Sequence, residues 1–359
     1  MTIGQTKRTK IRVVSTLRYA SRMLESFVRH KPVLSIAHIY PTFRCNLRCT
    51  YCNFPNLKTS ELSTDQWLSV IDQLADLGCR RVGVSGGEPL LRQDISAIIA
   101  RVRARGMYCT LTSNGLLVSK LIDRLSLLNA LTLSLDSVGP VNDSVRGEGM
   151  FDAVKEAIVA AKGAGLPVKI NAVMSAKTAP MLDELLSFIE RYDLHLTIGL
   201  MRSGAPDLWR DAASIKAEDD EIRKTVERIA GQTKTNPRLL FSEATYRYIA
   251  HWDDYSIDRY EVDELKADDP ILRDGPRCQA GRYYLNIIPD GTANPCVSTI
   301  GRIPGGNVIS DGVEGAWRQL HNHKCVACYS PCMVERNYLF SLKLRVVLNF
   351  MKRHLARFF

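Results

Sequence analysis

The chain has 359 residues, of which 45% are hydrophobic and 24% charged, so it can bury one large core and a small second domain. Its ten cysteines are too sparse for a disulfide-stapled secreted scaffold, and its first residues lack the apolar run of a signal peptide, so we expect a cytoplasmic protein. No run approaches the roughly 20 apolar residues of a spanning helix, which excludes an integral membrane protein.

The net charge of +10 is concentrated at the two ends of the chain. Residues 1–31 carry a net +7 and residues 336–359 a net +6, so residues 32–335 carry a net −3. A mildly acidic body without a basic, aromatic groove argues against nucleic acid as a partner. Drawn as helices, both ends place basic residues opposite bulky apolar ones. This pattern is typical of segments that bind an anionic membrane surface or dock their apolar face on the protein.

Between residues 33 and about 200, short apolar runs alternate with longer amphipathic stretches. In one such stretch, residues 63–77, the apolar residues recur at helical spacing behind a Ser63 cap. Six strand-then-helix units predict an α/β fold, namely a partial parallel (β/α)6 barrel similar to a TIM barrel, with its site at the C-terminal ends of the strands. The predicted strands are 33–37, 81–85, 108–112, 130–135, 168–173 and 194–198.

Residues 275–335 are rich in Gly, Pro and Cys, and segments 283–288 and 292–295 flank Pro289-Asp290-Gly291 as a predicted hairpin. A small cysteine-rich domain is therefore expected after the barrel. The predicted regions are a basic amphipathic N-terminal segment (1–32), the barrel (33–245), a connector with the cysteine-rich β-hairpin domain (246–335) and a basic amphipathic C-terminal helix (336–359).

Three cysteines with the spacing C-x3-C-x2-C, Cys45, Cys49 and Cys52, lie in the loop after the first predicted strand. Thiolates this close repel one another and oxidise unless a soft metal holds them. A closed zinc site would need a fourth ligand, for which His38 is the local candidate. Three thiolates alone would instead leave one position of a four-iron cluster open.

With Tyr51 before the third cysteine, this motif resembles the C-x3-C-x-aromatic-C hallmark of the radical S-adenosylmethionine (SAM) enzymes. The resemblance continues at the ends of the next three predicted strands. The matching residues are Gly86, Gly87 and Glu88 of a GGEP segment, Ser113 and Asn114, Ser134 and Asp136, and Arg146 beyond them. The resemblance implies that these residues bind SAM: the glycines let the backbone approach closely, peptide groups bind the amino group, and Arg146 pairs with the carboxylate.

The resemblance also implies that Cys45, Cys49 and Cys52 hold a 4Fe-4S cluster whose fourth iron SAM chelates. One electron, supplied by a reductant such as flavodoxin or ferredoxin, would split SAM into methionine and a 5'-deoxyadenosyl radical. That radical would abstract hydrogen from an unactivated carbon of the substrate. We therefore expect an enzyme, as an oxidoreductase or a transferase, and keep a non-enzymatic iron–sulfur or zinc-binding scaffold as the alternative.

A second set of five cysteines lies near the C-terminus: Cys278, Cys296, Cys325, Cys328 and Cys332. Their arrangement resembles the SPASM extension of radical SAM enzymes, or its shorter "twitch" form, which binds an auxiliary iron–sulfur cluster. Five cysteines suggest one auxiliary cluster, of the 4Fe-4S type, with one thiol left over. The first four are the preferred ligands and Cys332 follows closely, while a structural zinc ribbon is the alternative.

The substrate is predicted from the two basic ends. If both contact a membrane, the enzyme would lie on its inner face as a peripheral protein, and a membrane-associated lipid or isoprenoid would be the substrate. The alternative is maturation of a peptide or a tetrapyrrole cofactor, in which a peptide enzyme would borrow a separate leader-binding partner.

Overall fold

The computed structural model describes residues 31–202, 208, 215–303, 305–344, 346–348 and 350. The predicted N-terminal segment, apart from residues 31 and 32, and residues 351–359 lie outside this range. In the range described, no helix is long and apolar enough to cross a membrane.

The predicted partial parallel barrel is confirmed. Six parallel strands pair in chain order, and β8 joins the sheet parallel to β1 on the opposite side from β2, with β9 antiparallel to β8 at the edge. The predicted hairpin thus forms and extends the main sheet. The strands are β1 (Ile36–Ile39), β2 (Arg81–Val84), β3 (Tyr108–Ser113), β4 (Ala130–Ser134), β5 (Val168–Met174), β6 (His195–Leu200), β8 (Tyr284–Ile287) and β9 (Ala293–Asn294).

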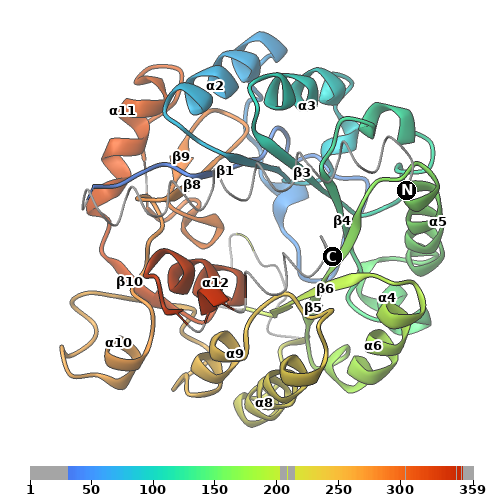
Figure 1. Ribbon diagram of the computed structural model, residues 1–359, viewed down its shortest axis with the longest axis vertical. Coiled ribbons are helices and arrows are strands. Elements are labelled where there is room, and N and C mark those ends of the chain that lie inside the picture. Colours follow the sequence, from blue (N-terminus) through green and yellow to red (C-terminus); the bar gives the residue numbers. More distant parts are fainter. Residues whose placement is uncertain are drawn as a thin grey trace.

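Helices lie around the outside of the curved sheet, as Figure 1 shows. They are α2 (Thr64–Asp76), α3 (Ile95–Ala104), α4 (Gly139–Arg146), α5 (Met150–Gly163), α6 (Leu182–Arg191), α8 (Asp219–Thr235) and α9 (Glu243–Ala250). The sequence pattern of α2 explains its position. Ser63 caps it through a capping box with Gln66, and its apolar stripe, including Trp67 and Ile71, is fully buried against the sheet side of the core.

The two faces of the barrel strands differ in polarity. In β3, the buried residues Cys109 and Leu111 belong to the core, whereas Thr110 and Thr112 line a cavity inside the barrel. Threonines and Asn171 of the neighbouring strands line the same cavity. A parallel strand buried on both faces is expected to be apolar throughout, so the polar inner face indicates a space for a ligand.

The remaining helices and strands follow the barrel: β7 (Arg259–Glu261), α10 (Pro270–Asp274), α11 (Gly312–Gln319), β10 (Cys325–Cys328) and α12 (Pro331–Phe340). β7 and β10 form a separate two-stranded antiparallel sheet. Helix α12 packs against β6 and α9, inside the ring of outer helices in Figure 1. Glu335 joins α12 to the start of α9, because its carboxylate accepts from Ser242 N at 2.9 Å and from Thr245 Oγ1 at 2.6 Å.

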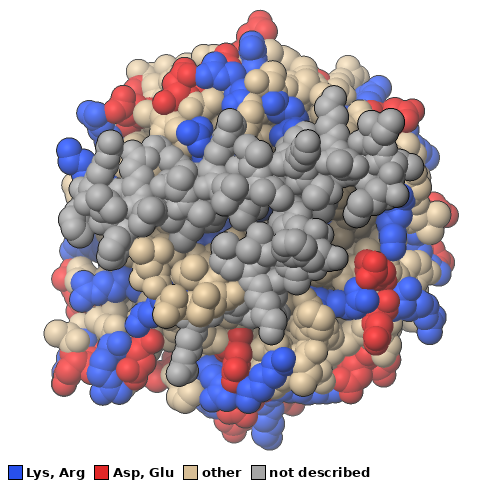
Figure 2. Space-filling view, in the orientation of Figure 1, with Lys and Arg blue, Asp and Glu red and all other residues tan. Residues whose placement is uncertain are grey.

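The predicted C-terminal helix over residues 336–359 differs from what is observed. Helix α12 begins earlier, at Pro331, and ends at Phe340, and Leu342 adopts a φ of 50° in the left-handed region, which interrupts the helix. Beyond this break Val346 is buried, while Leu344 and Leu348 are exposed. On the face shown in Figure 2, Lys and Arg side chains are interspersed with Asp and Glu around the rim.

Candidate active site

The cysteine loop, residues 45–52, follows β1 at the C-terminal edge of the sheet. Cys49 is buried, Cys45 and Cys52 are half-buried, and the three thiols lie close enough to influence one another's ionisation. Leu47 N donates to Cys45 Sγ over 3.4 Å, and Cys49 Sγ donates to the carbonyl oxygen of Arg146 over 3.8 Å. The loop therefore gathers the three thiols at one place.

The chemistry of these thiols fits an iron–sulfur cluster. Burial raises the pKa of all three, that of Cys52 to about 11, and such thiols give up their protons when a soft metal binds. Within the described residues, no group of three or more His, Cys, Asp or Glu side chains is placed to hold a metal ion. The fit therefore lies in the donor chemistry of three neighbouring thiols and not in a preformed metal geometry. His38, the candidate zinc ligand, lines the barrel cavity.

The two glycines after β2 hold the backbone that leads into the cysteine loop. Gly86 has a φ of 125°, and a Cβ on it would lie 2.3 Å from the carbonyl oxygen of Thr42. A Cβ on Gly87 would lie 2.2 Å from the carbonyl oxygen of Arg44. Only glycine allows this approach, which lets Gly87 N donate to Thr42 O and Glu88 N donate to Arg44 O. The glycines therefore serve close contact between two loops of the protein.

Glu88 links this segment to the end of β3. Its carboxylate is fully buried and accepts from Ser113 Oγ at 3.1 Å and from Asn114 N at 2.8 Å. Asn114 in turn donates through Nδ2 to Asn46 Oδ1 at 2.8 Å and lies 3.9 Å from Cys45 Sγ. A chain of hydrogen bonds thus runs from the GGEP segment to the first cysteine.

Tyr51 anchors the other end of the cysteine loop. Its hydroxyl donates to Asp136 Oδ2 at 2.9 Å and accepts from Arg146 Nη1 at 2.8 Å, and Arg146 Nη1 also donates to Asp136 Oδ2 at 2.9 Å. Asp136 is held by Val173 N, which donates to its Oδ1. Within the described part of the chain, Arg146 Nε is buried without a hydrogen-bond partner, so the guanidinium has a further donor to offer. Nearby, Ser134 ends β4 and is half-buried.

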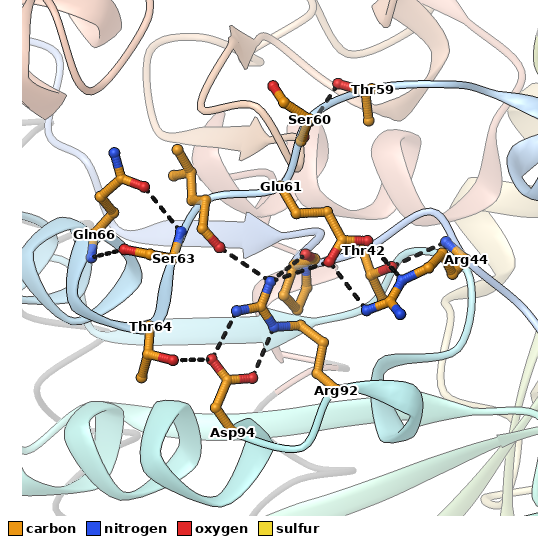
Figure 3. Close-up of polar contacts among 12 residues, drawn as sticks. Thr42, Arg44, Thr59, Ser60, Glu61, Ser63, Thr64, Gln66, Arg92 and Asp94 are labelled. Atoms are coloured by element: carbon orange, nitrogen blue, oxygen red, sulfur yellow. Dashed lines mark hydrogen bonds and ion pairs between the residues drawn. The ribbon is translucent and has the colours of Figure 1, made fainter.

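A further network, which the sequence analysis missed, fixes the residues that precede Cys45. Figure 3 shows Arg92 between Asp94 on one side and Glu61 with Thr42 on the other. Arg92 donates from Nε and Nη2 to both oxygens of Asp94, at 2.8 and 2.7 Å, and from Nη1 to the carbonyl oxygen of Pro41 at 3.1 Å. Glu61 binds Thr42 Oγ1 at 2.5 Å. Arg92 follows the GGEP segment, but no sequence pattern indicated that it binds the residues before Cys45.

Below the strand ends, the barrel encloses a cavity of about 410 Å³. Tyr40 and Phe54 line it near the cysteine loop, and Ile36 and Arg81 line it toward the N-terminal ends of the strands. Because Ile36 and Tyr40 are four residues apart on one strand, the cavity extends about 13 Å along the barrel. It is large enough for a substrate group directly beneath the cysteine loop.

The late cysteines divide into a group of four and a separate one. Burial is the main cause that raises the pKa of Cys296 and Cys328, and a hydrogen bond with Cys278 is the main cause for Cys325. Cys325 and Cys328 lie on β10, and Cys278 N donates to the carbonyl oxygen of Val326 on the same strand. Cys296 is connected to this group through its influence on the pKa of Cys328. Cys332 instead lines the barrel cavity, on the first turn of α12, with Ser330 Oγ 3.4 Å from its sulfur.

Comparison with known proteins defines the class. Residues 39–189 match the family profile of the Radical SAM superfamily. The mycofactocin maturase MftC of Mycobacterium tuberculosis is 30% identical over 313 residues, which cover 83% of this chain and 73% of that protein. The chain belongs to the radical SAM superfamily.

Particular relatives are close to it in sequence or fold. The PqqA peptide cyclase of Granulibacter bethesdensis is 29% identical over 268 residues, 71% of this chain and 65% of that protein, so the chain spans about two thirds of this relative's length. Among solved structures, SuiB of Streptococcus suis bound to SAM superposes with a TM-score of 0.63 at 19% identity, covering 83% of this chain and 69% of SuiB. The likeness to SuiB supports the fold.

Proposed function

We propose that this protein is a radical SAM enzyme that matures a peptide. The observation that carries the proposal is the convergence of three thiols, the Glu88–Asn114 connection and the Tyr51–Asp136–Arg146 cluster on one loop at the C-terminal edge of the barrel. Cys45, Cys49 and Cys52 would hold a 4Fe-4S cluster, which would supply the electron for reductive cleavage of SAM to methionine and a 5'-deoxyadenosyl radical.

The residues of the chain orient these groups. Asn114 and Asn46 fix the position of Cys45, and Tyr51 fixes that of the second half of the loop. Arg146 is the residue suited to the SAM carboxylate, because its Nε is buried and unpartnered beside the loop. The peptide groups around Gly86 and Gly87, with Ser134 at the end of β4, would complete the SAM site.

The peptide substrate is favoured over the lipid that the basic ends predicted. Among its relatives, the PqqA peptide cyclase is named for a peptide and MftC for a maturation. A lipid substrate rested on residues 1–32 and 336–359, and Leu339 and Val346 of the second segment are buried in the protein. We therefore take the peptide alternative, with a cytoplasmic location and a reductant such as flavodoxin or ferredoxin.

We further infer an auxiliary iron–sulfur cluster in the region 246–335. Its proposed ligands are Cys278, Cys296, Cys325 and Cys328, since these thiols influence one another while Cys332 faces the barrel cavity. Cys296, Cys325 and Cys328 are buried and Cys278 is half-buried, which suits a cluster shielded from water.

The test is the formation of 5'-deoxyadenosine by anaerobically reconstituted protein with SAM and dithionite. An enzyme of this class forms 5'-deoxyadenosine and methionine together, whereas a binding scaffold forms neither.

A further inference from the structure

Two buried polar groups of the barrel cavity have no hydrogen-bond partner among the residues that the structure describes. His38 Nε2 and Arg336 Nη1 are both buried without a hydrogen-bond partner, and both residues line the cavity. His38 comes from β1 and Arg336 from α12, so the two groups approach from different sides of the barrel. Leaving such groups unpaired costs free energy, which indicates that a ligand completes their hydrogen bonds.

The backbone makes room for His38 at this position. His38 pairs in register with Gly83 on β2, and a Cβ on Gly83 would lie 2.6 Å from His38 Nδ1. On the other side His38 is in register with Asn286 of β8, which also lines the cavity. The imidazole thus lies over a glycine inside the barrel, a position that packing of the core alone does not require.

The charge around His38 is positive. After burial, the charges of Arg336, Arg81 and Lys169 are the causes that lower the pKa of His38, and all three residues line the cavity. Among the described residues that line the cavity, the one acid is Glu335, whose carboxylate accepts from Ser242 and Thr245 at the start of α9. Three cationic side chains line the cavity, and the carboxylate of Glu335 is bonded to the start of α9. Such a cavity is suited to binding an anion.

We propose that His38 and Arg336 form a binding site for a carboxylate of the substrate inside the barrel. Resting on the proposed function, this names the substrate class as a peptide segment that presents a carboxylate, either from an acidic side chain or from a C-terminus. Arg336 donates to the carboxylate from Nη1, and His38 donates from Nε2. The carboxylate is thereby held beneath the cysteine loop, where a neighbouring C–H of the same peptide can face the SAM site.

The test measures binding of labelled probes to the reconstituted full-length protein with SAM present, by equilibrium dialysis. N-acetylglutamate α-amide offers a side-chain carboxylate and N-acetylalanine a terminal one, and each is compared with its carboxamide analogue. We expect one carboxylate probe to bind at least about tenfold more tightly than its carboxamide. That arm identifies the source of the carboxylate. If neither carboxylate probe binds, or carboxamides bind equally well, the proposal is wrong.

Substitutions assign the site to the two residues. Arg336→Gln and His38→Gln should each weaken binding of that probe about tenfold, and Arg336→Lys should retain most of it. Arg318→Gln, a matched control at an exposed position of α11, should leave binding unchanged. Melting temperature provides a second readout. Removing a cation from a positive cavity should leave the melting temperature of Arg336→Gln unchanged or raise it, whereas a merely structural arginine would lower it. Binding that both variants retain would overturn the proposal.

The wild-type assay of SAM cleavage separates the two hypotheses. If the carboxylate probe binds but no 5'-deoxyadenosine forms, the proposed function fails and the carboxylate site stands. If SAM is cleaved but no carboxylate probe binds, the proposed function stands and the carboxylate site fails.

Discussion

At the scale of single residues, Glu88 shows how a motif residue can act through its neighbours. The sequence places it in the GGEP segment as a SAM-binding residue. In the structure, its carboxylate accepts from Ser113 Oγ, Asn114 N and Leu90 N. Burial raises the pKa of Glu88 to about 7 despite these hydrogen bonds.

The raised pKa of Glu88 predicts that the stability of the folded protein depends on pH. Because the folded protein holds this proton up to about pH 7 and the unfolded chain loses it near pH 4.5, the stabilising contribution of the protonated group declines as pH rises between these values. Glu88→Gln cannot ionise, so its stability relative to wild type should rise by up to about 3 kcal/mol between pH 4.5 and pH 7. Melting temperatures of both proteins across this range test the prediction, which a pH-independent difference would contradict.

At the scale of secondary-structure elements, the cysteine loop depends on contacts that its own sequence does not reveal. The predicted strand ends place the loop correctly, because strand and helix periodicity are local properties. Arg92 donates to Glu61, which is 31 positions away in the sequence, and to the carbonyl oxygen of Pro41, which is 51 positions away. Periodicity cannot indicate contacts over such separations. The same limit applies to the pairing of β8 with β1.

Arg92 provides the test at this scale. Arg92→Gln removes the arginine that binds Asp94 and one of the two arginines that bind Glu61. The Arg92 side chain is only 8% exposed, so its loss should cost about 3 kcal/mol of stability. The loosened loop should also retain less iron after gel filtration. The control Arg101→Gln removes an arginine that is 42% exposed beside Asp72 and should change both quantities little. Equal iron retention in Arg92→Gln and wild type would contradict this role.

At the scale of the whole molecule, the sequence predicts the parallel barrel and both cysteine sets. It ranked Cys332 behind the other four late cysteines, but spacing alone does not show that this thiol, on α12, lines the barrel cavity. It also missed the cavity contribution of Arg336, since residues 336–359 were expected to form one continuous helix with a membrane-binding face.

The division of the late cysteines predicts different iron contents. Cys328→Ser removes a proposed ligand and should lower the iron bound by the reconstituted protein by about four atoms per chain, while Cys332→Ser, its matched neighbour, should retain the wild-type content. Iron and acid-labile sulfide analysis measures both. Loss of iron in Cys332→Ser with normal iron in Cys328→Ser would show that the ligand assignment is wrong.

The proposed radical chemistry depends on the three thiols of the loop after β1. The decisive measurement compares 5'-deoxyadenosine formation by wild type, the Cys45→Ala/Cys49→Ala/Cys52→Ala variant and Cys109→Ala, whose buried thiol lies in the core on β3. Wild type and Cys109→Ala should cleave SAM when reduced, and the triple variant should form no product. Continued cleavage by the triple variant would contradict the assignment of these cysteines as the site of radical chemistry.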